Sequence, residues 1–348
     1  MFREIVLNRT TLLLTRIQIY CKRLFTKNID ASKLEKLRLE LLEESKLSRS
    51  YVILILGSCI IATLGLISNS AAVIIGAMIV APLMLPIRAL AFGALEGDVI
   101  LFRRGLIAVT VGTILAITLA WLLASLAAIS MFGSEILART KPTLIDLGIA
   151  IAAGGISGYA KIQPKISGSL AGTAIAVALM PPICVIGIGL ANGNWSLSMG
   201  ATLLYLTNLL GITLSCMAAF LVTGYVKLAQ ARKALIWAIA LTGILLIPLS
   251  LSFIDLVKQT RLETSLKQAL LKRTITFQRV DLIKTETNWL VNPPEVRLTV
   301  RSQETVTPKQ VQLLEEFVER AMGQPFRLIF DVSQVEEVSG NQTTKPRQ

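Results

Sequence analysis

Seven long apolar segments occupy the middle of the chain. About 20 consecutive apolar residues in a helix cross the roughly 30 Å hydrocarbon core of a bilayer. The pattern therefore predicts an α-helical polytopic membrane protein with about seven transmembrane helices, of which the first is short. We place these helices near residues 51–67, 71–92, 105–130, 143–160, 170–191, 199–222 and 235–254.

The N-terminal flank, residues 1–50, alternates apolar and charged positions with helical spacing. The segment around 4–25 suits a helix that lies in the membrane interface, because basic residues are interleaved with large apolar ones. A second helix is predicted from Ser32, with Glu35 in capping-box spacing. This second helix either lies in the interface as well or is solvated and packs on a partner.

The C-terminal flank, residues 255–338, predicts an amphipathic helix over 255–272 followed by a small α/β domain. A further helix begins with a capping box at Thr307 and ends at Gly323. Alternation of apolar and polar residues predicts strands at 274–281, 295–301 and 326–332. Residues 339–348 are polar, and we expect them to be disordered.

Two proline-containing segments of the membrane domain resemble each other. Positions 74–87 read IIGAMIVAPLMLPI and positions 173–186 read TAIAVALMPPICVI. When they are aligned on Pro82 and Pro181 their offset is 99, and the neighbouring spans are offset by similar amounts. Three spans therefore repeat as a unit.

An odd number of crossings separates the equivalent spans, so the second copy is expected to sit upside down in the membrane. The transmembrane domain, residues 51–254, is thus predicted to be a 3+3 inverted repeat with halves 51–130 and 143–222, followed by a seventh span at 235–254.

The prolines lie near the middle of their spans and so near the bilayer midplane. Proline lacks a backbone donor and frees a carbonyl group of the preceding turn, which is costly in hydrocarbon unless protein, water or a ligand satisfies it. Paired breaks of this kind form the substrate sites of many transporters. We therefore take Pro82, Pro86, Pro181 and Pro182 as candidate substrate-path residues. The alternative is a pair of structural kinks that neighbouring helices satisfy.

Ionisable side chains inside a span are expensive and are default candidates for function. Arg88 lies near the cytoplasmic end of the second span, where its side chain can instead reach the interface. Asp146 follows Thr143 by three positions, which is the spacing of a structural capping box. The uncharged candidates are Asn69, in the turn between the first two spans, and Thr207 and Asn208, in the middle of the sixth.

The absence of histidine from the sequence excludes much enzyme chemistry. Imidazole metal ligands, histidine general bases and histidine-containing triads are all removed. Asp146 is the one carboxylate placed inside a predicted span, so few side chains there could act as a general acid or base. We therefore expect no enzyme activity, no catalytic residue, no metal and no cofactor.

Of the 348 residues, 53% are apolar and 16% are charged, and the formal net charge is +13. An ordinary soluble domain has roughly 25% charged residues. The basic residues are dispersed rather than gathered in one patch with interleaved aromatic residues. The charge therefore favours an anionic membrane surface over nucleic acid as the partner.

The distribution of basic residues also predicts a topology. With the N-terminus in the cytoplasm, seven loop cations lie inside and two lie outside, as the positive-inside rule requires. A rival topology, with re-entrant second and fifth segments, moves four of these cations outside and fits less well. We expect a multi-pass protein of the bacterial inner (plasma) membrane with a cytoplasmic N-terminus and an extracytoplasmic C-terminal domain.

Three stretches of the membrane domain carry a resemblance to a known family. They are SCIIATLGLISNSAAVIIGAMIVAPLMLPI at 58–87, GALEGD at 93–98 and SLAGTAIAVALMPPICVIGIGLANG at 169–193. Over positions 50–225 the chain resembles the domain-of-unknown-function family numbered 389, an uncharacterised hydrophobic domain of bacteria and archaea. This resemblance implies an integral membrane domain and supplies neither an activity nor ligand residues.

Two functions fit these patterns. In the first, the protein is a transporter or channel that moves a small solute or ion by alternating access about the paired breaks. In the second, it is a non-transporting membrane scaffold or sensor that acts through its terminal segments. The expected partners are the lipid bilayer, a small solute or ion, and a second copy of the chain. Polar residues converging on a cavity would favour transport, whereas leucine and isoleucine filling that space would favour a scaffold.

Overall fold

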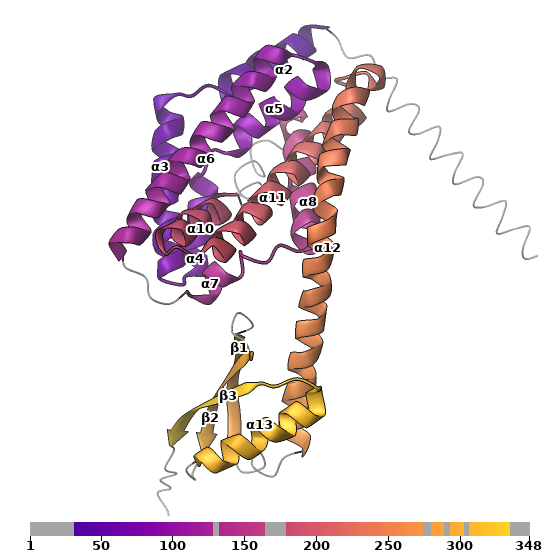
Figure 1. The fold of residues 1–348 in the computed structure, drawn as a ribbon. Helices are drawn as coiled ribbons and strands as arrows, with labels where there is room; N and C mark the ends of the chain where they lie inside the picture. Colours follow the sequence, from indigo (N-terminus) through magenta and orange to yellow (C-terminus); the bar gives the residue numbers. More distant parts are fainter. Residues whose placement is uncertain are drawn as a thin grey trace, which may run out of the picture. The chain divides into compact units, whose positions relative to one another are not determined.

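The computed structural model describes residues 31–127, 132–163, 179–273, 280–288, 293–302 and 306–334. The chain divides into two compact units, Met1–Phe253 and Ile254–Gln348. Helices build the first unit, whereas the second unit also contains a β-sheet (Figure 1).

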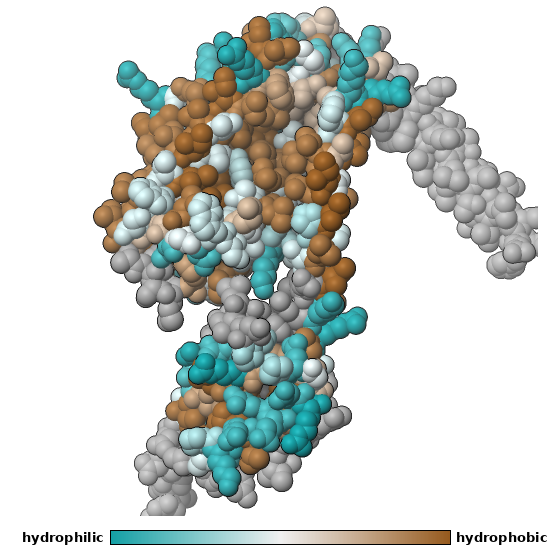
Figure 2. Space-filling model, in the orientation of Figure 1, coloured by the Kyte–Doolittle hydropathy of each residue, from teal (hydrophilic) through white to brown (hydrophobic). Residues whose placement is uncertain are grey.

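The described part of the chain contains five helices that are long and apolar enough to cross a membrane. Many of their large apolar side chains are exposed, and Figure 2 shows such residues over most of the visible face of the first unit. Exposed apolar surface of this extent is stable in lipid rather than in water. The protein is therefore a helical polytopic membrane protein. The five helices are α3 (Arg49–Ile67), α6 (Val99–Ala127), α8 (Leu144–Ile162), α11 (Trp195–Val222) and the Leu228–Ile254 part of α12 (Leu228–Arg273).

The other two predicted spans differ from single straight helices. The second consists of α4 (Ala71–Val80) and α5 (Met84–Glu96), which are bent by 53° at the break between them. Of the fifth, the structure describes α10 (Met180–Ala191), whose 12 residues reach about 18 Å. Residues 164–178 lie outside the described ranges. By length and composition the described chain thus has five helices that could cross a membrane, or six such spans if the bent pair forms one.

The N-terminal flank contributes α2 (Ala31–Glu44), which begins next to the predicted Ser32. Leu37 and Leu41 of α2 are buried in the same apolar cluster as the membrane helices. The second predicted N-terminal helix therefore packs on the chain's own core. The first, around 4–25, lies outside the described residues.

Helix α12 continues without interruption from the seventh predicted span into the amphipathic segment predicted at 255–272. The sequence predicts two elements there because hydropathy falls after position 254. No helix-breaking residue accompanies that fall in hydropathy, so the backbone hydrogen bonds continue.

The second unit contains a three-stranded sheet in the order β1-β2-β3. The central strand β2 pairs antiparallel with β1 and parallel with β3. A parallel pair needs a crossover connection, and α13 supplies it. The apolar core of the second unit consists of Leu266 of α12, Val296, Leu298 and Val300 of β2, Leu314 and Val318 of α13, Phe326, and Leu328 of β3. The element bounds are β1 Val280–Asn288, β2 Glu295–Ser302, α13 Pro308–Met322 and β3 Arg327–Gln334.

Helix α13 begins after Thr307 and ends at Gly323, as the capping residues predict. The described strand β1, Val280–Asn288, includes residues 280 and 281 of the strand predicted at 274–281 and extends beyond its predicted end. This strand contains two threonines and a register shift between Leu282 and Lys284, so its apolar alternation is weak. Residues 274–279 lie outside the described ranges.

Candidate functional site

The interruption predicted at Pro82 is present. Helix α4 ends at Val80, and Ala81 adopts an extended backbone conformation. Pro82 has no N–H, so it cannot satisfy the carbonyl of Met78, four residues earlier. Ser58 of α3 reaches this turn, because its Oγ donates to the carbonyl of Ala77 at 2.9 Å. A buried break therefore divides this span into two half-helices.

Pro181 and Pro182 do not interrupt a described helix. They lie in the first turn of α10, which begins at Met180, and proline is tolerated there because first-turn N–H groups have no partner within the helix. Pro86 occupies the same place in α5, which begins at Met84. The structure thus pairs Pro86 with Pro182, at an offset of 96 rather than the 99 that aligning Pro82 with Pro181 gives.

The offset of 96 also matches the sequences that surround these prolines. Leu83-Met84 and Pro86-Ile87 correspond to Leu179-Met180 and Pro182-Ile183. Each helix is preceded by the matching leucine, Leu83 or Leu179, with a helical backbone conformation. Identical residues therefore start both half-helices.

The turns that follow α5 and α10 match at the same offset. Gly97 and Gly193 both adopt a positive φ, of 79° and 64°. Each is followed by a side chain that caps the next helix, since Asp98 Oδ1 accepts from Leu101 N at 3.1 Å and Asn194 Oδ1 accepts from Leu197 N at 3.0 Å. The chain therefore contains two helical hairpins with matching turns, α5–α6 and α10–α11.

The two hairpin turns lie at opposite ends of α8. At the C-terminal end of α8, Lys161 bonds to α2, and α2 in turn bonds to Asp98 of the α5–α6 turn. Before the N-terminal end of α8, the main chain of Thr140 lies directly against Gly200 of α11. Because α8 is 19 residues, or about 28 Å, long, the hairpins have opposite directions along it.

Helix α6 lies between the two half-helices. A Cβ built on Gly105 of α6 would lie 2.7 Å from the carbonyl oxygen of Pro86 in α5. A Cβ built on Gly187 of α10 would lie 2.6 Å from the carbonyl oxygen of Ile117 in α6. The absence of side chains at these positions lets the backbones of both halves approach α6 closely.

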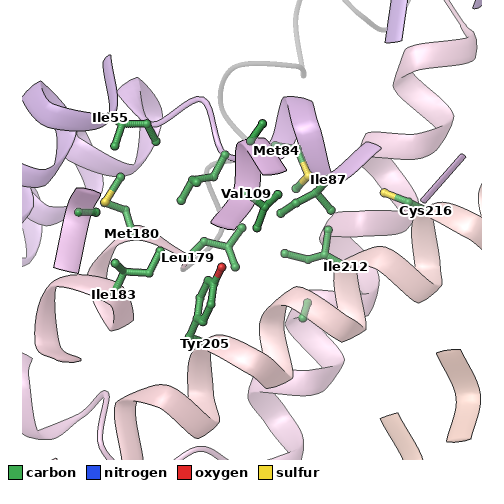
Figure 3. Close-up of a cluster of buried hydrophobic side chains, with 14 of the residues drawn as sticks. Ile55, Met84, Ile87, Val109, Leu179, Met180, Ile183, Tyr205, Ile212 and Cys216 are labelled. Carbon is green, nitrogen blue, oxygen red and sulfur yellow. The ribbon is translucent and has the colours of Figure 1, made fainter. Parts of the chain in front are cut away.

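The described side chains between the half-helices are mostly apolar. Figure 3 shows Met84 and Ile87 of α5, together with Leu179, Met180 and Ile183, in one buried cluster. Tyr205 of α11 enters this cluster, and its hydroxyl is 2.7 Å from Thr113 Oγ1. Pro82, Pro86, Pro181 and Pro182 are also buried. Among the described residues, packing rather than converging polar groups fills this centre.

Asn69 and Asp146 make local structural contacts. Asn69, with a φ of 53°, accepts a hydrogen bond from Glu135 N at 2.8 Å and so holds the short helix α7 (Ser134–Leu137) against the α3–α4 turn. Asp146 Oδ2 accepts from Thr143 N at 2.7 Å, which gives the predicted capping box. Neither side chain belongs to the buried apolar cluster.

Thr207 and Asn208 are both buried in the middle of α11, as predicted. The hydroxyl of Thr207 donates to the carbonyl of Leu203 at 2.7 Å, within its own helix. Thr207 therefore has a local hydrogen-bond partner.

Arg88 is the candidate with the most unusual surroundings. It is 7% exposed, and its guanidinium lies 3.1 Å from Glu44 Oε2 of α2. Lys161 of α8 donates to Glu44 Oε1 at 2.9 Å and to Glu40 Oε2 at 2.7 Å. The carboxylate of Glu44 therefore bridges cations from α5 and α8.

Hydropathy did not reveal this cluster, because Glu40 and Glu44 lie in a polar flank. A helical projection of α2 would have shown that these two glutamates lie beside the apolar face of the helix. Glu40 and Glu44 are spaced i, i+4 beside the buried Leu37 and Leu41, so these carboxylates lie at the edge of the packed face.

A second ionic contact attaches α2 near the α5–α6 turn. Arg38 Nε donates to Asp98 Oδ2 at 2.6 Å. Desolvation raises the pKa of the Asp98 carboxyl, but the hydrogen bonds from Arg38 and from the backbone of Leu101 and Ile100 outweigh it and hold the pKa below its ordinary value.

We expect the contribution of Asp98 to the attachment of α2 to disappear only in acid. A carboxyl whose pKa is lowered on folding stabilises the folded state above the ordinary aspartate pKa, about 4, and this contribution is lost as the pH falls through the lowered value. Hydrogen–deuterium exchange of α2 amides, compared between the wild type and Asp98→Asn at each pH, will measure it. The difference should be constant above pH ~4 and shrink below it. A difference that does not depend on pH would contradict the assignment.

Comparisons with known proteins agree with the resemblance in the sequence. The family model described as "Domain of unknown function (DUF389)" matches residues 78–214. An uncharacterized protein of Methanocaldococcus jannaschii is 30% identical over 202 residues, which are 57% of this chain and 63% of that relative. The match thus spans less than two thirds of the relative's length. No solved structure matches the chain significantly. Residues 78–214 are therefore similar to the family of the domain of unknown function DUF389.

Proposed function

We propose that the protein is a transporter for a small solute or ion, built as a 3+3 inverted repeat. The observation that carries this proposal is the pair of matching hairpins, α5–α6 and α10–α11, at opposite ends of α8. Inverted repeats with helices broken inside the membrane are a recurrent architecture of secondary transporters, whose halves rock about a central site. The proposal involves no chemical reaction.

The break at Pro82 supports a broken span better than a re-entrant loop. Three residues separate the end of α3 from the start of α4, whereas α5 ends two residues before Asp98, which bonds to α2. Because α2 also precedes the start of α3, the pair α4–α5 begins at one end of α3 and returns to the other. In this proposal, the apolar cluster of Figure 3 is the closed interface between the two repeat halves.

The loop charges support a cytoplasmic N-terminus and an extracytoplasmic C-terminal domain within this proposal. We place the protein in the bacterial inner membrane, with the bilayer as its surroundings and a second copy of the chain as a candidate partner.

Flux measured in proteoliposomes tests the proposal. The panel contains inorganic phosphate, succinate, neutral amino acids, sodium and potassium. Pro82→Ala supplies the missing N–H and favours a continuous α4–α5, so we expect it to lose most of the flux. Pro181→Leu is the matched control, because the counterpart of Pro181 at the offset of 96 is Leu85, and it should keep near wild-type flux. Absence of flux for every solute, or equal flux in both variants, would refute the proposal.

A second candidate function is a membrane scaffold or sensor that acts through its terminal segments. The apolar packing of Met84, Ile87, Leu179, Met180 and Ile183 at the starts of α5 and α10 favours it, because a scaffold needs no path for a polar solute. It predicts no flux in the same proteoliposomes, together with a defined oligomer or complex after cross-linking of the full chain in membranes.

A further inference from the structure

We infer that Arg88 and Lys161 form a binding site for a small oxyanion, either a carboxylate or a phosphate, and that Glu44 of α2 occupies this site from within the chain. The inference names the substrate class of the proposed transporter and rests on that proposed function.

The first observation is the burial of Arg88. Among the buried side chains in the described ranges it is the only charged one. It lies four residues after the start of α5, one turn beyond the break that divides the span. A charge in such a place is costly unless it has a partner or a role.

The second observation is that the guanidinium is incompletely satisfied. Its contact with Glu44 is a single N–O approach of 3.1 Å, and within the described part of the chain neither Arg88 Nε nor Glu44 Oε2 has a hydrogen-bond partner of good geometry. Guanidinium groups bind carboxylate and phosphate best through two parallel hydrogen bonds. Glu44 therefore occupies the site without forming both of the parallel hydrogen bonds that the guanidinium can donate.

The third observation is the second cation. Lys161 Nζ contacts the other oxygen of the same carboxylate at 2.9 Å, so one anionic group is held between α5 and α8. One turn before Lys161, Ser157 is fully buried, and its hydroxyl has no hydrogen-bond partner among the described residues. Ser157 and Lys161 are spaced i, i+4 and so share a face of α8. The two cations that already hold one carboxylate, Arg88 and Lys161, are a donor set for an oxyanion.

The occupant comes from an element that lies outside the membrane helices. Without Glu44 and Glu40, Arg88 and Lys161 would leave two positive charges at this end of the bundle. An oxyanion that reaches them must compete with α2, so α2 acts as an internal competitor that keeps the site closed in the absence of the ligand.

The test uses the full chain in nanodiscs of phosphatidylcholine, with inorganic phosphate and succinate as probes at constant ionic strength. Glu44→Gln removes the competing charge at nearly constant size, and we expect it to bind one of the probes about tenfold more tightly than the wild type. Arg88→Gln should lose that binding. Arg88→Lys keeps the positive charge but loses the planar guanidinium, so it should weaken binding of the probe. This variant replaces Arg88→Gln in the experiment if Arg88→Gln does not fold. Glu43→Gln is the matched control, because Glu43 is exposed on α2 and pairs with Lys46.

A further arm adds phosphatidylglycerol without free anion. Stabilisation by this lipid that is lost in Arg88→Gln identifies a lipid phosphate as the ligand, whereas binding of free phosphate or succinate identifies a soluble one. Equal responses of the wild type, Glu44→Gln and Arg88→Gln to all three probes would overturn the inference. Anion binding without flux would support the site and refute transport. Flux without anion binding at Arg88 would support transport and refute the site.

Discussion

Gly154→Ala will destabilise the membrane domain by about 2–3 kcal/mol, because α8 and α11 touch through their backbones at this position. A Cβ built on Gly154 would lie 2.6 Å from Ile212 Cα and would also strike the carbonyl of Ile212 and the hydroxyl of Ser215. Two of these three atoms are main chain and cannot rotate away. The helices would therefore have to separate along a buried contact.

The neighbouring glycine provides a matched control in the same helix. A Cβ on Gly155 would have no atom within 4 Å, so Gly155→Ala should be neutral or stabilise the helix by up to about 1 kcal/mol, because alanine has the higher helix propensity. Unfolding of the purified protein in mixed detergent and dodecyl sulfate will measure both variants. Equal stability of the two alanine variants would show that α8 and α11 are not packed as described.

The sequence predicts this contact only in part. Gly154, Gly155 and Gly158 share a small-residue pattern that is typical of close helix packing. The pattern does not tell which of them faces a neighbour, because the choice depends on the rotation of α8. The structure places Gly154 and Gly158 against α11 and leaves Gly155 open.

The same distinction applies to the prolines. Hydropathy and proline content were enough to locate the break at Pro82, because a proline interrupts the backbone hydrogen bonds locally. They also predicted a break at Pro181 and Pro182, whereas the structure has these prolines in the first turn of α10. They gave the repeat an offset of 99, since two prolines looked equivalent in the sequence. In the structure, the helix starts, the positive φ of Gly97 and Gly193 and the two capping side chains match each other at an offset of 96 instead.

The ionic partners of Arg88 could not be predicted from spans alone. Glu44 precedes Arg88 by 44 positions and lies on a helix outside the apolar block. Only the docking of α2, through Leu37 and Leu41, brings its carboxylates to the membrane helices. Tertiary packing of a polar flank thus decides whether Arg88 reaches the interface or is held in a buried ion pair.

Glu44→Ala should cost about 2–3 kcal/mol of stability, because it leaves the buried guanidinium of Arg88 without its counter-ion. The value lies at the low end for a buried pair because the Glu44 side chain is 21% exposed. Adding Arg88→Met should restore most of this loss, since an apolar side chain of similar length needs no partner. Glu43→Ala, one position away, should change stability by less than about 0.5 kcal/mol.

Unfolding of the wild type, Glu44→Ala, Arg88→Met, the double variant and the control Glu43→Ala in a buffer free of phosphate and carboxylates completes this cycle. Equal costs for Glu44→Ala and Glu43→Ala, or simple additivity with Arg88→Met, would show that the pair does not stabilise the fold. Adding phosphate to the same unfolding experiment then measures binding, because a ligand of the folded state raises the free energy of unfolding in proportion to the logarithm of the ligand concentration. If an oxyanion takes the place of the missing carboxylate, phosphate or succinate will reduce the cost of Glu44→Ala and will leave the double variant unchanged.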